Sequence, residues 1–160
     1  MDKKIETSGK NKIYRKLAKQ LAGLGFERTK TTFYTRPKEY VVEFIHLHKF
    51  TFCPGFRVHF GIRVLNDSSD GPALNGPMSP DRLFSYGESE HSLEKCANEI
   101  HKFCRTKGER WFKKWANQSK LAKSKKSPLH EKTKRELQDS IEGKLNVENI
   151  KKSKVILGIT

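Results

Sequence analysis

The chain has 160 residues and a formal net charge of +15, with 34% apolar and 32% charged residues. This length allows one domain with an appendage, and the low apolar fraction means that the core is concentrated in part of the chain. There is no run of about 18 apolar residues, which argues against a membrane-spanning protein. The positive charge favours a partner that carries phosphates, anionic lipid headgroups or acidic side chains.

The aromatic residues mark the limits of the folded part. All ten Phe, all four Tyr and both Trp lie within residues 13–115, and residues 116–160 contain none. We therefore expect a folded domain over residues 1–118 and a lysine-rich, partly helical extension over residues 119–160. The three cysteines form no CxxC pair and no apolar leader follows Met1, so we expect a reduced, cytoplasmic protein without membrane insertion.

The first half of the chain contains one helical pattern and three strand patterns. Residues 11–24 place apolar side chains at helical spacing, which predicts a helix. The β-prone residues 31–36 predict a short strand. Residues 40–50 and 56–65 predict two longer strands, and the Cys-Pro-Gly turn signal between them predicts an antiparallel hairpin.

The second half begins with residues 66–80, a segment rich in Gly, Pro, Ser and Asp that predicts a long loop. Ser79 is expected to act as the N-cap of a short helical turn that runs through Phe84. Residues 89–107 predict the second strong helix, and a third helix is expected from about residue 109.

Together these elements predict an α+β fold. We expect an antiparallel sheet of three or more strands with two or three helices packed on one face, plus a basic C-terminal helical extension. In the extension, a narrow apolar stripe predicts one marginal helix over about residues 129–145, and residues 155–159 either pair with a sheet edge or dock elsewhere. The residues expected to be buried are Phe33, Ile45, Leu47, Val58, Phe60, Ile62, Leu93, Ile100 and Trp111.

The two faces of the predicted hairpin differ in chemistry. Alternation assigns Ile45, Leu47 and the facing aliphatic and aromatic residues of the second strand to the core. Placing Leu47 opposite Phe60 gives the expected register, and a slip of two residues would leave every side chain on the same face. The other face collects the candidate binding residues, which are Phe44, His46, His48, Phe50, Arg57, His59 and Arg63.

This second face suggests several kinds of chemistry. A zinc site would need three or four ligands, and the two arginines and the scarcity of carboxylates argue against a metal, so we predict no metal and no cofactor. A metal-free hydrolase could use His48 and His59 as acid and base, with Arg57 or Arg63 on a phosphate. Interleaved aromatic and basic side chains also suit stacking on RNA. The alternative without a ligand is a sheet face covered by the extension or by a partner.

The order of these elements resembles a known family. The segment from Gly25-Phe26 through Arg36, and the strand Phe56–Ile62 with its Gly61, are similar to the bacterial domain-of-unknown-function family 4304. The resemblance covers about residues 11–118 and implies a small bacterial α+β domain. It implies no catalytic residues. His46 to Lys49 stand where the family tends to have a Gln-containing segment, and the extension has no counterpart in it.

Three functions remain as hypotheses. The first is a non-catalytic binding module for an acidic protein partner, which needs a large surface patch near the His/Arg face or the 66–80 loop. The second is RNA or DNA binding, which predicts one continuous basic surface from Arg57 and Arg63 to the basic residues 113–135. The third is the His-dependent hydrolase. The oligomeric state is left open.

Overall fold

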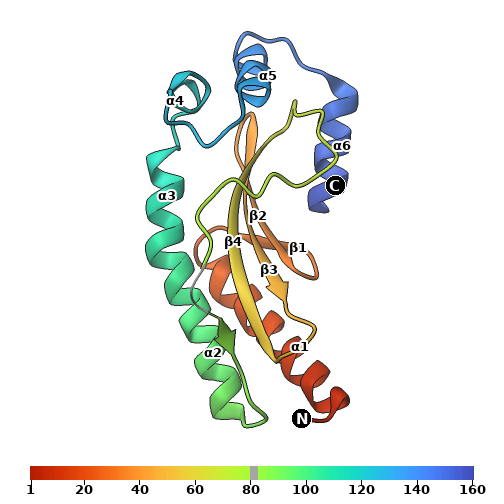
Figure 1. Cartoon of the computed structure of the whole chain (residues 1–160). Coiled ribbons are helices and arrows are strands. Elements are labelled where there is room, and N and C mark those ends of the chain that lie inside the picture. Colours follow the sequence, from red (N-terminus) through yellow and green to blue (C-terminus); the bar gives the residue numbers. More distant parts are fainter. Residues whose placement is uncertain (80–82) are drawn as a thin grey trace.

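The computed structural model describes residues 1–79 and 83–160 (Figure 1). Within them the sheet has five strands in the order β1-β2-β3-β4-β5, all antiparallel, so the predicted α+β class is confirmed. The strands are β1 (Glu27–Lys30), β2 (Phe33–Pro37), β3 (Val41–Lys49), β4 (Gly55–Val64) and β5 (Phe84–Ser85). The helices are α1 (Lys3–Ala22), α2 (Glu90–Phe103), α3 (Glu109–Lys114), α4 (Gln118–Lys123), α5 (Glu131–Ile141) and α6 (Val147–Leu157).

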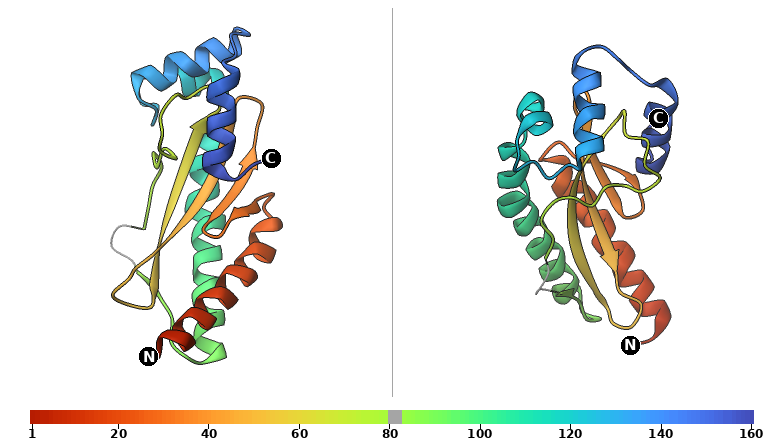
Figure 2. Two further views of the ribbon diagram at one scale, coloured as in Figure 1. Left: turned by 90° about the vertical axis from the view of Figure 1, so that its right-hand side faces the viewer. Right: turned by 45° about the horizontal axis from the view of Figure 1, so that its top comes forward.

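Helices α1 and α2 pack on one face of the sheet, and α6 lies on the opposite face (Figure 2, left). The apolar stripe of α1, with Ile13, Leu17 and Leu21, shares one buried cluster with the core residues of β3 and β4. At the solvent edge, three polar pairs with the same sequence offset join the two parallel helices: Lys12–Glu90, Lys16–Glu94 and Gln20–Asn98. The main core therefore lies between the sheet and α1 and α2.

The β3–β4 register differs from the expected one by two residues. Ile45 faces Phe60, and Leu47 faces Val58. The hairpin turn is tighter than expected because the Phe50 amide donates to the Gly55 carbonyl at 3.1 Å, which closes the ladder earlier. Since the slip is an even number, every side chain keeps its predicted face.

Other expectations need correction. Phe33 and Trp111 are half-buried, whereas the other seven residues expected in the core are buried. Helices α2 and α3 are joined by a π-helical turn, Cys104–Gly108, and are not separated by a break. Gly108 is required there because a Cβ at this position would lie 2.7 Å from the ring of Phe60. The glycine therefore permits close packing on the sheet.

The predicted helical turn after Ser79 partly falls on residues 80–82, which lie outside the described residues. Ser79 is hydrogen-bonded to strand β4. Its hydroxyl accepts from the Val58 amide at 3.0 Å and its own amide donates to the Val58 carbonyl at 3.1 Å, and Phe84 belongs to strand β5. The segment before it follows the edge of β4, where the Asn75 side chain bonds to both the amide and the carbonyl of Ile62 at 2.9 Å. This segment shields a strand edge that would otherwise be free to pair.

The extension is more ordered than one marginal helix. It forms α4, α5 and α6, and residues 155–159 end α6 and its C-cap at Gly158, which has a φ of 71°. Leu157 is buried against the second face of the sheet, which decides between the two options for this segment in favour of docking on a face. In the described residues no helix is long and apolar enough to cross a membrane.

Candidate nucleic-acid interface

The second face of the sheet, which faces the viewer in Figure 1, has a covered part and an open part. Helix α6 and the segment 65–79 lie over its upper part, where Phe44 and Arg63 are fully buried. The lower part ends in the β3–β4 hairpin. There His46 and His59 are half-buried and His48 is exposed. The structure therefore divides the seven candidate residues into two that are enclosed and five that share the open part.

Six rings form a continuous row on the open part. In order they are Phe33, His46, His59, His48, Phe50 and Phe52, and we call this set the ring ladder. Successive ring centroids are separated by 4.4, 6.0, 6.3, 5.1 and 5.3 Å. The Arg57 guanidinium lies 5.3 Å from the centroid of Phe50 and adds a cation to one end. Strands β2, β3 and β4 and the hairpin turn all contribute, so the row depends on the strand register.

Two histidines of the ring ladder are uncharged at neutral pH. Burial lowers the pKa of His46 to about 4, and burial together with the neighbouring His48 and Arg57 lowers the pKa of His59. The Nδ1 atom of His46 lies 3.2 Å from the Thr32 carbonyl oxygen. Because a carbonyl only accepts, Nδ1 carries the proton and Nε2 is left as an acceptor. His46 and His59 therefore form a neutral pair of rings, inclined to each other by 33°, and the His48 ring stands nearly perpendicular to His59 at 89°.

Apolar side chains extend the site at the hairpin end. Phe52 is 82% exposed, and Met78 and Leu83 are 40% and 42% exposed. Met78 forms a β-bridge with His59, and Leu83 lies next to Gly55. Phe52 contacts the Phe50 ring and leaves most of its own surface in water, which is typical of a contact residue for a partner.

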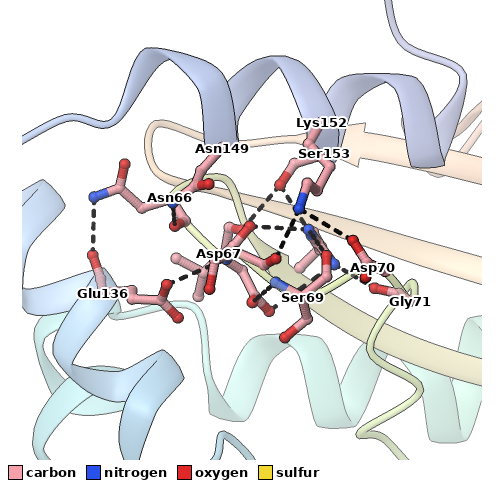
Figure 3. Close-up of polar contacts among 12 residues, drawn as sticks. Asn66, Asp67, Ser69, Asp70, Gly71, Glu136, Asn149, Lys152 and Ser153 are labelled. Carbon is pink, nitrogen blue, oxygen red and sulfur yellow. Dashed lines mark hydrogen bonds and ion pairs between the residues drawn. The ribbon is translucent and has the colours of Figure 1, made fainter.

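Arg63 is buried, and its hydrogen bonds show a structural role. Its guanidinium donates to the Ser153 hydroxyl at 2.9 Å, to the carbonyls of Asp67 and Ser69 at 3.0 and 2.8 Å, and to the carbonyl of Gly71. Figure 3 shows these acceptors where the 66–71 segment meets α6. Arg63 is therefore not part of an exposed basic surface with Arg57, and α4 and α5 lie at the opposite end of the molecule from the hairpin (Figure 1).

The remaining candidate groups carry other roles. Among the described residues, no group of three or more His, Cys, Asp or Glu side chains is placed to hold a metal ion. Glu43, on the core-facing side of β3, pairs with Arg36 at 2.7 Å. Cys96 and Cys104 are buried in the core, and burial raises the pKa of the Cys96 thiol to about 12, which makes it unreactive.

Sequence reasoning did not include four members of this surface, namely Phe33, Phe52, Met78 and Leu83. Phe33 pairs with His46 across β2 and β3, so it could be assigned to this surface only once the register between those strands was known. Phe52 lies in the turn, where alternation gives no face. Met78 lies in the long loop and reaches His59 only through the folding of that loop along β4.

Comparisons with known proteins give no match: neither a family model, nor a curated protein, nor a solved structure is similar to this chain. The resemblance to family 4304 thus stays a prediction, and the site itself is the basis for inferring the function.

Proposed function

We propose that this chain is a non-catalytic nucleic-acid-binding protein that holds single-stranded RNA or DNA on the ring ladder. The observation that carries the proposal is the unbroken row of six rings on the open half of an antiparallel sheet. Every base has a flat π-face, so a row of exposed rings binds successive bases by stacking, whatever the sequence. The partly exposed phenylalanines and the neutral imidazoles both present such faces.

The positive charge of the protein also supports nucleic-acid binding. The net charge of +15 attracts a polyanion from all sides, and Arg57 places one cation beside the stacking surface. Bases in a duplex are already stacked on one another and cannot reach the rings. The proposal therefore requires preference for single strands over duplex, whereas a surface that acted only through its charge would favour the higher charge density of the duplex.

The experiment is fluorescence anisotropy with labelled single strands of about 12 nucleotides, as RNA and as DNA, with the matching duplex as a control. Phe52→Ala removes the most exposed ring, and Val155→Ala is its matched control because Val155 is 72% exposed on α6. Loss of one stacked base is worth about 1–3 kcal/mol, so we expect Phe52→Ala to weaken binding by roughly 5- to 150-fold. Val155→Ala should bind like the parent.

A second pair of variants separates a local contact from general attraction. Arg57→Ala removes the cation beside the ring ladder, and Arg15→Ala removes the same charge from α1 on the far side of the sheet. We expect Arg57→Ala to lower affinity and to reduce the salt dependence by about one phosphate contact, and Arg15→Ala to have a much smaller effect. Equal losses from both variants, with no effect of Phe52→Ala, would contradict the proposed site.

A protein partner is the second candidate, because Phe52, Met78 and Leu83 expose apolar surface at the hairpin end. An acidic protein with an apolar pocket would suit both this surface and the net charge. The anisotropy experiment separates the two functions, since a protein-binding surface gives no dependence of nucleic-acid affinity on Phe52. Electrophoresis of the same RNA under denaturing conditions tests the hydrolase hypothesis, because His48 and His59 acting as acid and base would cleave it.

A further inference from the structure

The row of rings does not end where the open part ends. Phe33, the first ring of the ring ladder, also contacts Phe44, with centroids 5.8 Å apart, and Phe44 is fully buried beneath α6. Arg63 lies under the same helix. The covered part of the face thus holds the same two chemical types as the open part, where Phe50 is paired with Arg57.

The attachment of α6 is separate from the main core. Its buried apolar contact is a small cluster of Val42, Phe44 and Leu157, which does not merge with the cluster that α1 and α2 form on the other face. The other contacts are polar and run along the whole helix. Ser153 accepts from Arg63, Lys152 donates to the Ser68 carbonyl at 3.0 Å, and Asn149 donates to the Asn66 carbonyl at 3.1 Å. At the C-terminal end, the Thr29 hydroxyl donates to the Leu157 carbonyl. Because the apolar contact lies outside the main core and the remaining contacts are polar, α6 can open while the main core stays folded.

We propose that α6 is an autoinhibitory cover of the nucleic-acid surface, and that a strand long enough to pass Phe33 competes with α6 for the face beneath it. This inference rests on the proposed function. When α6 leaves, the ring of Phe44 loses its cover by Leu157 and becomes available to a further base. Arg63 then loses only its bond to Ser153 and keeps its carbonyl acceptors in the 66–71 segment. Short strands bind the ring ladder alone, and longer strands must open α6 before they gain the contact with Phe44.

Hydrogen exchange tests the opening of α6 without any ligand. In the parent we expect the amides of α6 to exchange at least about tenfold faster than those of β3 and β4. Leu157→Ala should accelerate α6 further and leave β3 and β4 unchanged, because Leu157 lies outside the main core. Ser153→Ala is a second loosening variant that leaves the apolar cluster intact. The matched control is Val155→Ala, on the exposed side of α6.

Binding then tests the competition. Loosening α6 removes part of the opening cost, so we expect Leu157→Ala and Ser153→Ala to bind a strand of about 12 nucleotides roughly threefold or more tightly than the parent, and a strand of about three nucleotides unchanged. Exchange of α6 only through global unfolding would overturn the inference and leave the proposed function intact. Unchanged or weaker binding of the long strand by both loosened variants would do the same. If the parent binds no strand at all, the proposed function fails, while faster exchange of α6 still identifies it as a separable segment.

Discussion

Replacing Arg63 should destabilise the protein more than replacing any cation on its surface. The side chain is fully buried, and its guanidinium supplies four hydrogen bonds, to one hydroxyl and three carbonyl groups. The buried carboxylate of Asp67 lies 4.0 Å away and supplies the compensating charge. Arg63→Ala leaves all of these groups without their donor.

The magnitude follows from which of the groups water can reach. Ser69 and Gly71 are exposed, so their carbonyls can bond to solvent once the arginine is gone, whereas the Ser153 hydroxyl and the Asp67 carbonyl are buried and each loses its N–H donor. A buried polar group that loses its hydrogen-bond partner costs about 1–3 kcal/mol. Two such groups give about 2–6 kcal/mol, in agreement with the roughly 3–5 kcal/mol typical of a broken buried ion pair. We therefore expect Arg63→Ala to lower the free energy of unfolding by about 4 kcal/mol.

Urea unfolding followed by tryptophan fluorescence and far-UV circular dichroism measures this difference. Arg57→Ala is the matched control, since it removes the same charge from the open part of the same strand, and should cost less than about 1 kcal/mol. Arg63→Lys keeps the charge and loses the planar set of donors, so it should recover only part of the loss. A cost below about 1 kcal/mol for Arg63→Ala would refute the reasoning, because it would mean that the 66–71 segment rearranges freely.

Two further predictions concern the same face. In Gly61→Ala, a Cβ would lie 2.2 Å from the Phe44 ring and 2.7 Å from the Ala73 carbonyl oxygen, so we expect a loss of about 3 kcal/mol in urea unfolding, partly recovered by adding Phe44→Leu. The pKa of His46 is about 4 in the folded state, below its ordinary value of 6.5, so the unfolded chain binds the proton more tightly. Stability should therefore be constant above pH 6.5 and fall by about 2 kcal/mol towards pH 4, with allowance for partial exposure, and His46→Gln should flatten this slope; an unchanged slope would show that other groups cause it.

Alternation along the two long strands allowed the faces of the hairpin to be assigned from the sequence. Two neighbouring residues on a strand must point to opposite sides, so Ile45 and Leu47 could be placed in the core and His46 and His48 outside it without knowledge of the turn. The register could not be obtained in the same way. It depends on the hydrogen bond that closes the turn between Phe50 and Gly55, and the turn residues allow more than one closure.

The extension was harder to predict because its helices are stabilised by contacts far away in the sequence. The polar half of α6 is held by Arg63 and by Asn66, whose side-chain oxygen accepts from the Asn146 amide at 2.7 Å. The sequence of such a helix shows only a weak helical pattern, because most of the helix stability comes from packing. The short apolar run at residues 155–159 showed that something docks there, and only the fold shows on which surface.

One signal in the sequence did separate the covered part from the open part. Along the second face, β3 presents Val42 and Phe44 and then His46 and His48, so the same face changes from apolar to polar near residue 45. Exposing Val42 and Phe44 to water costs free energy, whereas the imidazoles can form hydrogen bonds with water. Only the apolar half of the face therefore needs a cover. Helix α6 supplies that cover with Leu157. The boundary between the two halves is thus set by hydration, and the ring pair Phe33–Phe44 crosses it, which is why a ligand that follows the ring ladder must meet α6.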